Sequence, residues 1–343
     1  MTKMNNSNEI LRLVESTLIP HTAFQSALAR ITQALAHAPG SSEPTGIALV
    51  GEARTGKTRV LEEADMLLTR SRTSEGAFVP ILRMRTPSHP TVKGVASLLL
   101  RMLGDPKWER GTEVGMSVRL IDMMGACRTQ MLMVDEFQHF FDKGTHKIFH
   151  EVADWLKNLM DETKVVVVVS GLEECLPVLR GNEQLTGRFN KPIFMRRFLW
   201  DDVNSMAEFL GILQAFHEAL YDHLEMPNLA SPEMAFRCWY ATGGLIGLLA
   251  KILRQAVWNA VDARVRTIDL EGLRAAHELA AWDELGERPG PSPFARSFSV
   301  EPSAEKIAQA LRLGRREEPT NLRRAHIPKR KGPDDRSGTE AVR

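Results

Sequence analysis

The stretch Gly51-Glu52-Ala53-Arg54-Thr55-Gly56-Lys57-Thr58 decides the fold of this 343-residue chain. It has the pattern GxxxxGK[ST], it follows the short apolar segment Gly46–Val50, and a helical pattern continues from Arg59 to Arg70. A glycine-rich turn between a strand and a helix lets backbone N–H groups surround phosphate groups, and the helix N-terminus adds a favourable dipole. We therefore expect residues 51–58 to bind nucleotide phosphates, with Lys57 on the β- and γ-phosphates and the Thr58 hydroxyl on Mg²⁺.

An acidic pair, Asp135-Glu136, directly follows the apolar segment Met131–Val134. Ligands of open α/β sheets bind beyond the carboxyl ends of the strands, so this pair should lie near the phosphates. We expect Asp135 to hold Mg²⁺ through water, and Glu136 to orient and deprotonate the attacking water. A glutamate in this place favours hydrolysis over phosphoryl transfer to a small molecule. The alternative is a strand that ends in solvated carboxylates.

Three further polar positions are candidates for sensing or completing the site. Ser170 follows the β-branched segment Val165–Val169 and could lie between Glu136 and the γ-phosphate, although it could also cap the next helix. Arg188 is the first candidate, and Arg180 the second, for an arginine that reaches the γ-phosphate bound to a neighbouring subunit. For either arginine the alternative is a surface salt bridge.

Strand and helix patterns alternate up to about residue 200. Strands are expected over residues 46–50, 78–84, 131–134, 165–169 and 192–195, with helical patterns over 10–38 (broken at Pro20), 59–70, 95–103, 114–127 and 149–160. Such alternation predicts an α/β protein in which a parallel sheet lies between two layers of helices. The pure β-branched strand Val165–Val169 is typical of a strand that is buried on both faces.

The strand signal ends after residue 200. Helices are expected over residues 203–220, 232–240, 245–263 and 270–285, and one short helix over 304–313. Pro and Gly are concentrated in residues 288–293, and residues 311–343 contain ten basic against five acidic residues. These changes predict a nucleotide-binding core with an N-terminal helix (1–200), a small helical lid (201–286), and a linker with a basic, flexible tail (287–343).

Composition excludes several other classes of protein. The net charge is +1, so the overall charge does not identify a partner. Cys127, Cys175 and Cys238 are far apart and form no zinc pattern, which predicts reduced thiols in a cytoplasmic protein. No apolar run approaches the roughly 18 residues of a membrane span, and no signal peptide precedes residue 10.

With these residues described, the chain resembles the TniB/TnsC family of AAA+ transposition regulators. The resemblance rests on five segments: 51–58 as Walker A, 134–139 (Val-Asp-Glu-Phe-Gln-His) as Walker B, an insert at 85–91 and 100–106, Ser-Gly-Leu-Glu at 170–173, and Gln-Leu-Thr-Gly-Arg-Phe at 184–189. It implies an AAA+ P-loop NTPase fold that binds ATP and Mg²⁺. It also implies a homo-oligomer that assembles as a ring or helical filament on duplex DNA, recruits a DDE transposase, responds to a target-selection protein, and disassembles on hydrolysis.

One departure from that resemblance concerns the lid. Many AAA+ lids carry an arginine after a glycine-rich turn, whereas here the turn Thr242-Gly243-Gly244 leads into Leu245-Ile246-Gly247. Lys251 or Arg254 is expected to substitute, and hydrolysis should be slow.

DNA contacts are expected to be sequence-independent and to involve phosphates, because no DNA-reading motif is present. By analogy with that family the candidates are Lys93, Arg119, Lys143 and Lys147, and for each of them the alternative is a solvated surface charge. The basic tail is a second candidate region, either for DNA or for an acidic patch on the transposase. The alternative function is an AAA+ NTPase coupled to protein remodelling or secretion, without a role on DNA. DNA-stimulated, ATP-dependent assembly would distinguish the two.

Overall fold

The computed structural model describes residues 10–17, 21–74, 76–88, 90–142, 146–181, 183–281 and 290–314. The first part of the chain alternates strands and helices. In chain order its elements are α2 (Thr22–His37), β1 (Gly46–Val50), α3 (Lys57–Asp65), β2 (Ser71–Thr73), β3 (Gly76–Phe78), β4 (Ile81–Arg85), α4 (Val92–Leu103), α5 (Glu113–Ala126), β5 (Met131–Asp135), α6 (His139–Asp142), α7 (His146–Thr163), β6 (Val166–Gly171), η1 (Glu173–Cys175), α8 (Leu176–Arg180), α9 (Glu183–Thr186) and β7 (Ile193–Phe194).

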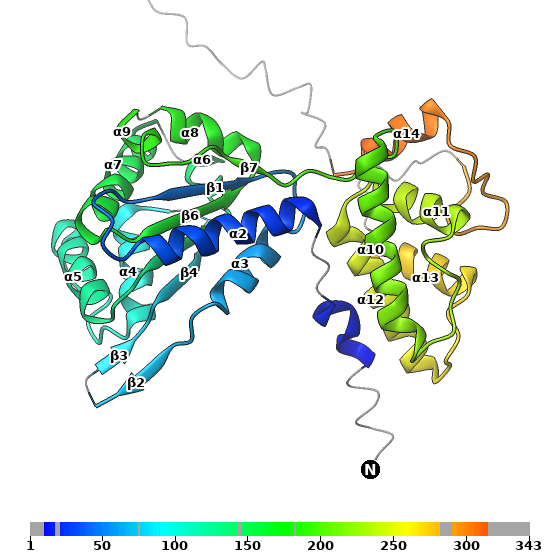
Figure 1. Ribbon diagram of the computed structural model, residues 1–343, viewed down its shortest axis with the longest axis horizontal. Coiled ribbons are helices and arrows are strands. Elements are labelled where there is room, and N and C mark those ends of the chain that lie inside the picture. Colours follow the sequence, from blue (N-terminus) through cyan, green and yellow to red (C-terminus); the bar gives the residue numbers. More distant parts are fainter. Residues whose placement is uncertain are drawn as a thin grey trace, which may run out of the picture. The chain divides into compact units, whose positions relative to one another are not determined.

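A five-stranded parallel sheet forms the centre of this part, in the order β4-β5-β6-β1-β7. Alternate strand residues point to opposite faces. Ile47 and Leu49 pack with buried residues of α2 and α3, whereas Ala48 and Val50 belong to the cluster formed by α4, α5 and α7. The result is a three-layer α/β core, as the sequence predicts (Figure 1).

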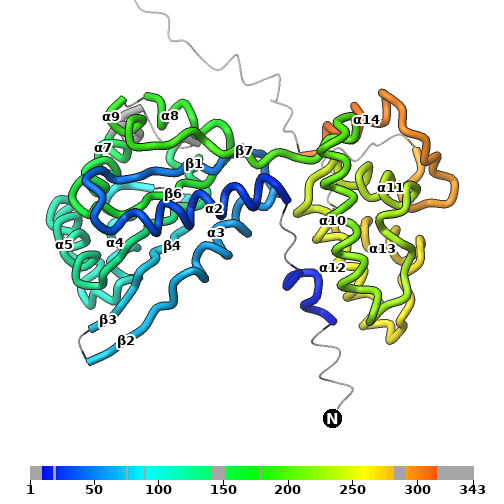
Figure 2. Tube along the Cα trace, in the orientation of Figure 1, coloured from blue at the N-terminus to red at the C-terminus, as the bar shows by residue number. Residues whose placement is uncertain are grey.

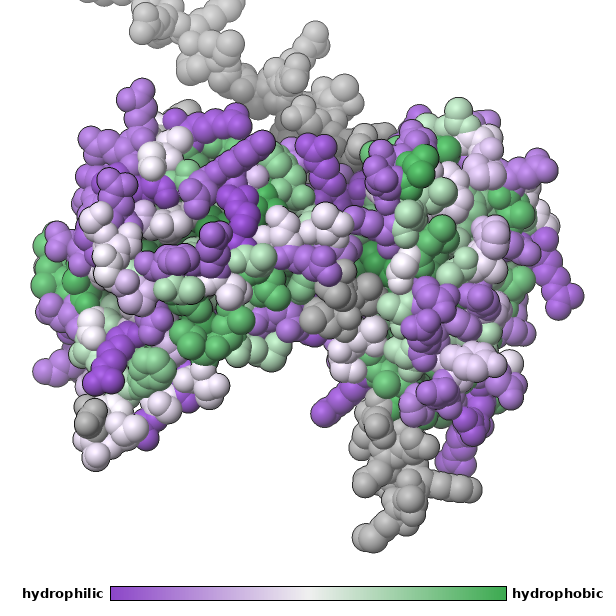
Figure 3. Space-filling model, viewed as in Figure 1, coloured by the Kyte–Doolittle hydropathy of each residue, from purple (hydrophilic) through white to green (hydrophobic). Residues whose placement is uncertain are grey.

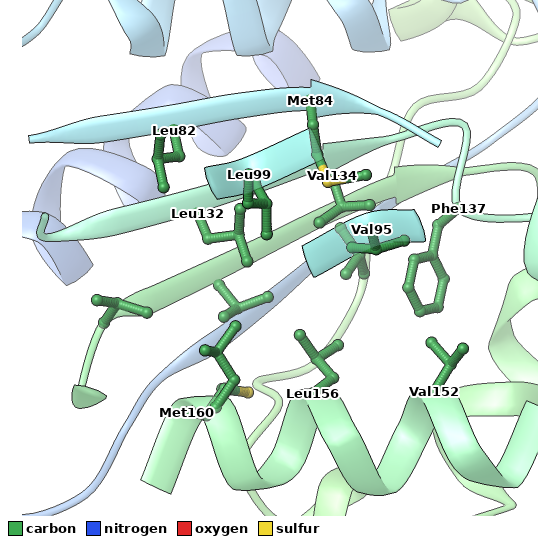
Figure 4. Packing of buried hydrophobic residues seen from close by; sticks show 14 of the residues in the cluster. Leu82, Met84, Val95, Leu99, Leu132, Val134, Phe137, Val152, Leu156 and Met160 are labelled. Carbon is green, nitrogen blue, oxygen red and sulfur yellow. The ribbon is translucent and has the colours of Figure 1, made fainter. Parts of the chain in front are cut away.

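The second face of the sheet shows why its strands are so apolar. Leu132 and Val134 of β5 point toward Val152, Leu156 and Met160 of α7 in Figure 4. All five residues of β5 are buried, and so are all six of β6. Helices cover both faces of these central strands, so hydrophobic residues are needed at consecutive positions.

The expected strand over residues 78–84 is wrong in one respect. Two elements occupy this region: β3 pairs with β2 as an antiparallel hairpin, and β4 begins after Pro80. Proline has no N–H to donate to a ladder, and here its carbonyl accepts from the backbone N–H groups of Gln130 and Met131. The helix expected to reach Arg70 ends at Asp65, and the hairpin follows it (Figure 2).

The remaining described residues form a helical domain. Its elements are α10 (Val203–Tyr221), α11 (Pro232–Thr242), α12 (Ile246–Ala263), α13 (Leu270–Ala280) and α14 (Ala304–Leu311). Asp202, Ser231 and Asp269 cap the first, second and fourth of these helices by accepting backbone N–H groups three residues later. Phe209, Phe236 and Trp239 lie in the hydrophobic core of this domain.

Residues 290–313, which we expected to belong to a linker and tail, contribute to that core. Phe294, Phe298 and Ala310 are buried in the same cluster as the lid helices. Figure 1 shows α14 close to α11, and the two helices are in contact. The basic residues from position 315 onward lie outside the described residues.

Hydrophilic and apolar side chains are interspersed on the face drawn in Figure 3. None of the described helices is long and apolar enough to cross a membrane. Within the described ranges, no group of three or more His, Cys, Asp or Glu side chains is placed to hold a metal ion. All three cysteines are free and buried.

Candidate nucleotide-binding site

The loop from Gly51 to Gly56 connects β1 to α3 at the carboxyl edge of the sheet. Gly56 has a φ of 94°, which glycine adopts readily, and Arg54 also lies in the left-handed region with a φ of 66°. A Cβ atom on Gly51 would be 1.9 Å from the carbonyl oxygen of Met195, so only glycine fits there. The loop is therefore wrapped tightly around the N-terminus of α3, as a phosphate-binding loop requires.

Lys57 carries the charge of this loop. Its Nζ atom donates to the carbonyl oxygens of Gly51, at 2.8 Å, and Glu52, at 2.6 Å. Burial lowers the pKa of Lys57, and the nearby carboxylates of Glu136 and Asp135 oppose that shift. The ammonium thus lies inside the loop, where an anionic phosphate would pair with it.

Thr58 and Asp135 meet at the start of α3, as the sequence predicts. The Thr58 hydroxyl donates to Asp135 Oδ2 at 2.9 Å, and Asp135 Oδ1 accepts from the backbone N–H of Glu136 at 2.9 Å. Asp135 is only 7% exposed. A hydroxyl and a carboxylate beside a phosphate loop are hard oxygen ligands of the kind that Mg²⁺ prefers, so this pair fits the ion.

Glu136 follows Asp135 with an unusual backbone conformation, a φ of 56°. Its side chain is held from two sides: the Gln138 amide donates to Oε2, and Arg85 Nη2 lies 3.5 Å from Oε1. Gln138 is itself buried and accepts the backbone N–H of Leu172 at 3.2 Å. The carboxylate is thus fixed at the mouth of the site.

Thr58, Asp135 and Glu136 line one cavity of about 500 Å³. Its lining residues are Thr58, Asp65, Arg83, Met84, Arg85, Asp135 and Glu136. Sequence reasoning missed Arg85 and Gln138 as parts of this site. Arg85 could have been found because it ends the strand next to β5, and Gln138 because it lies in the Walker B segment 134–139, although that segment did not by itself assign it a contact with Glu136.

Ser170 lies near the carboxyl end of β6, between the strands that carry the loop and Asp135. It pairs in register with Leu49, and its hydroxyl is buried without a hydrogen-bond partner among the described residues. The following 3-10 turn has Leu172 as its N-cap and no side-chain cap. Ser170 therefore does not cap that turn, and its unpaired oxygen is available to a ligand or water.

Arg188 is engaged away from these groups. Its Nε and Nη2 atoms donate to the two carboxylate oxygens of Asp161, each at 2.7 Å, and Nη1 donates to the carbonyl of Gln184. Within the described residues this is the intramolecular pair that we considered as the alternative to an arginine finger. Arg180 ends α8 and lines a separate cavity of about 220 Å³ with Leu176 and Pro192.

A second cavity, of about 420 Å³, adjoins the phosphate loop at Gly56. Its lining residues are Val14, Glu15, Thr17, His21, Phe24, Gly56, Arg59, Glu62, Phe216, Ile246, Gly247, Ala250 and Arg254. Burial lowers the pKa of His21, against the raising effect of Glu208. The lining is partly apolar, with Phe24, Phe216 and Ile246, and partly charged, with Glu15, Arg59, Glu62 and Arg254. Residues 18–20, which directly precede His21, lie outside the described residues.

The lid touches the loop directly. The backbone N–H of Gly247 donates to the carbonyl of Arg54 at 2.8 Å. Of the two cations proposed to replace the missing lid arginine, Arg254 lines the second cavity, where its guanidinium lies 3.1 Å from Glu15 Oε1. Lys251 is not among the lining residues of that cavity.

The DNA-contact candidates have different surroundings. Arg119 is occupied by Asp105, at 2.7 Å, and by the carbonyls of Lys107 and Arg110. It therefore holds the loop between α4 and α5. Lys93 is exposed on α4. Lys143 and the side chain of Lys147 lie outside the described residues.

Comparisons with known proteins agree with this geometry. A family model described as "Bacterial TniB protein" matches residues 9–198. No curated protein matches the chain.

Solved structures with the same fold include ORC and Cdc6 proteins. The Aeropyrum pernix ORC2 protein, in its ADPNP-ADP complexes, superposes with a TM-score of 0.59 at 13% identity over 79% of this chain and 72% of its own. Cdc6p from Pyrobaculum aerophilum gives 0.58 at 14% identity, over 79% and 71%. The Aeropyrum pernix ORC1 protein in complex with DNA gives 0.55 at 17%, over 78% and 69%. These likenesses show the AAA+ P-loop fold.

Proposed function

Because this chain belongs to the TniB family, we propose that it is an ATP-dependent regulator of transposition that assembles on duplex DNA. In this proposal residues 1–200 are the nucleotide-binding core and residues 201–286 the lid. Copies of the chain form a ring or helical filament around DNA, recruit a DDE transposase, and respond to a target-selection protein. Hydrolysis of ATP returns the assembly to free subunits.

The observation that carries the proposal is the cluster of Thr58, Asp135 and Glu136 beside a wrapped phosphate loop. The Thr58 hydroxyl and Asp135 Oδ2 are 2.9 Å apart, and Glu136 directly follows Asp135 at the mouth of the same cavity. Thr58 and Asp135 would hold Mg²⁺, which neutralises phosphate charge when it is bound. Lys57 would bind the β- and γ-phosphates.

Glu136 is the residue that we propose as the base. It would accept a proton from the water that attacks the γ-phosphate, while Ser170 orients that water from the neighbouring strand. Arg188 would complete the site of an adjacent subunit after release from Asp161. The roles of Glu136 and Ser170 follow from their placement at the carboxyl ends of β5 and β6, whereas the role of Arg188, which lies beside the amino end of β1, rests on the family resemblance.

Binding to DNA is proposed to be independent of sequence. The solved ORC1 relative in complex with DNA supports a DNA-binding use of this fold, at 17% identity. Lys93 is the exposed candidate for a phosphate contact, and the basic residues beyond position 314 are a second region. Contacts of this kind weaken steeply with salt.

Negative-stain electron microscopy tests the proposal. The protein is imaged with short duplex DNA, with ATP or ADP, and with neither, and Lys57→Ala serves as the control. Rings or filaments that need ATP and DNA together support the proposal. Assembly that needs ATP but ignores DNA would favour a protein-remodelling role instead, and absence of assembly would contradict both.

A further inference from the structure

Arg197 is a buried cation two residues after Met195, on the segment that leads from β7 to the helical domain. Its side chain is 3% exposed. Nε donates to the two carboxylate oxygens of Glu52, at 3.0 and 2.9 Å, and Nη2 also donates to that carboxylate. Glu52 belongs to the phosphate loop, so the loop is tied to a residue that sequence reasoning did not single out.

The remaining donors of Arg197 reach two other segments. Nη1 donates to the carbonyl of Gly243, at 3.3 Å, in the turn before α12, and to the carbonyl of Leu311 at 3.1 Å. Nη2 donates to the carbonyl of Leu313 at 2.8 Å. One guanidinium therefore joins the phosphate loop, the lid turn and the end of α14. A buried charge that loses such partners is strongly destabilising, so the three segments are held together by one group.

The lid turn also packs closely against the end of α14. Gly243 has a φ of 57°, and a Cβ there would lie 2.3 Å from the carbonyl oxygen of Ala310. The Tyr240 hydroxyl donates to Gln309 Oε1 at 2.6 Å, which fixes α14 against α11. A displacement at Arg197 thus reaches residues 304–313, which directly precede the basic stretch of the chain.

Nucleotide binding acts on the other side of the same loop residue. The Lys57 ammonium donates to the carbonyls of Gly51 and Glu52. When Lys57 pairs with a phosphate, the carbonyls of Gly51 and Glu52 lose the ammonium group as a hydrogen-bond donor. Glu52 is therefore linked to bound nucleotide through its backbone carbonyl, and it is linked to Arg197 through its side-chain carboxylate.

We propose that Arg197 is a positioning residue that links occupation of the phosphate loop to the anchoring of residues 304–313. This inference rests on the proposed nucleotide binding. Arg197 holds Glu52 in the conformation in which the loop surrounds phosphates, and a loop ordered by nucleotide in turn fixes Arg197 on α14. Such coupling is reciprocal: nucleotide tightens the C-terminal anchor, and loss of the anchor weakens nucleotide binding by the same factor.

Hydrogen exchange measured by mass spectrometry tests the link, with and without a non-hydrolysable ATP analogue. We expect the analogue to slow exchange over residues 304–313 by roughly fivefold or more in the wild-type protein. In Arg197→Lys, which keeps the charge but loses the fork of donors, that slowing should be lost. The affinity of this variant for a fluorescent ATP analogue should fall by the same factor.

Arg237 provides the matched control. Its side chain is 4% exposed, and it donates to the carbonyls of Pro293 and Ala295 at 2.6 and 2.9 Å while pairing with Glu233. It anchors the same C-terminal segment, but its hydrogen bonds and ion pair among the described residues do not include the phosphate loop. Arg237→Lys should raise exchange over residues 290–298 and leave the response of residues 304–313 to nucleotide unchanged.

The outcomes separate this inference from the proposed function. Protection of residues 51–58 by the analogue without any change over 304–313 would overturn the link and leave nucleotide binding intact. This outcome can be measured with the wild-type protein alone, so the inference can be tested even if Arg197→Lys does not fold. An Arg197→Lys protein that keeps the wild-type response would also overturn it. Absence of protection at 51–58 would refute nucleotide binding and the link together.

Discussion

Replacing Asp161 by asparagine tests whether Arg188 serves the fold of its own chain or the site of a neighbouring subunit. Arg188 donates to both carboxylate oxygens of Asp161 at 2.7 Å. The guanidinium must leave this carboxylate before it can reach a phosphate on another subunit. Asp161→Asn removes the charge that holds Arg188 while it keeps the size and shape of the side chain.

The magnitude follows from the exposure of the pair. The side chains of Arg188 and Asp161 are 23% and 31% exposed, so solvent screens their attraction and we expect a loss of about 1 kcal/mol. That corresponds to about a fivefold change in an equilibrium and to a fall in Tm of about 2–4 °C. If Arg188 acts in the neighbouring site, its easier release should keep or raise the ATPase rate of the assembled protein, by up to about fivefold.

The stabilisation also has a defined pH dependence. The hydrogen bonds from Arg188 hold the pKa of Asp161 below its ordinary value. A carboxyl group with a lowered pKa in the folded state stabilises the protein above its unfolded-state pKa of about 4, and this contribution is lost as the pH falls through the folded-state value. The difference in unfolding free energy between wild type and Asp161→Asn should therefore be present at neutral pH and disappear in acid.

The assay is ATP hydrolysis by the protein assembled on duplex DNA, with assembly checked by light scattering. Arg188→Ala should bind ATP and lose hydrolysis, whereas Asp161→Asn should keep it. If both variants assemble and both lose hydrolysis equally, the pair is required as a structural unit and the finger role of Arg188 is refuted. Wild-type activity in Arg188→Ala would transfer that role to another arginine.

Three further changes address the site and the backbone around it. Lys57→Ala should abolish nucleotide binding, measured by titration with a fluorescent nucleotide, because the loop loses its cation; unchanged affinity would contradict the assignment. Glu136→Gln should bind ATP and keep assemblies intact in micrographs, since the proposed base is absent, and normal hydrolysis would remove Glu136 from that role. Gly244→Ala should lower the free energy of unfolding by about 3 kcal/mol or more in urea, because the residue has a φ of +75° and the new Cβ would lie 1.9 Å from the Phe198 carbonyl oxygen. Gly40→Ala is its control: the φ is +86° with nothing within 4 Å, so only the strain of about 1–2 kcal/mol is expected.

The central part of the site could be predicted because its residues depend on local order along the chain. Thr58 begins the helix after one strand, and Asp135 ends another strand of the same parallel sheet. Parallel strands bring their carboxyl ends to one edge, so the two side chains meet although 77 positions separate them. The same reasoning placed the central strands β1, β5 and β6 correctly, since a strand covered on both faces has no polar face to interrupt its pattern.

The hairpin of β2 and β3 could not be predicted in this way. Its first strand, Ser71–Thr73, is fully exposed and has no apolar alternation to mark it. The helical pattern therefore seemed to continue past Asp65, where the helix ends.

The C-terminal segment was misleading for a different reason. Residues 288–293 are rich in proline and glycine, which is typical of a linker. Phe294 and Phe298 nevertheless fill the core of the helical domain, and Arg237 binds the backbone between them. Two aromatic residues in an irregular segment produce no periodic signal, so only tertiary packing reveals that the segment belongs to the folded domain.

The surroundings of Glu136 bear on its proposed role as the base. Both carboxylate oxygens are engaged, Oε2 by the Gln138 amide and Oε1 by Arg85 at 3.5 Å. Each carboxylate oxygen has two lone pairs, so Glu136 can keep these contacts while it accepts a proton from water in the role that we propose, and the contacts serve to orient it. Gln138 also accepts the backbone N–H of Leu172, which follows the strand that carries Ser170. If Glu136 is the base, a change that moves β6 or Arg85 would alter the orientation of its carboxylate, and the rate of hydrolysis should change with it.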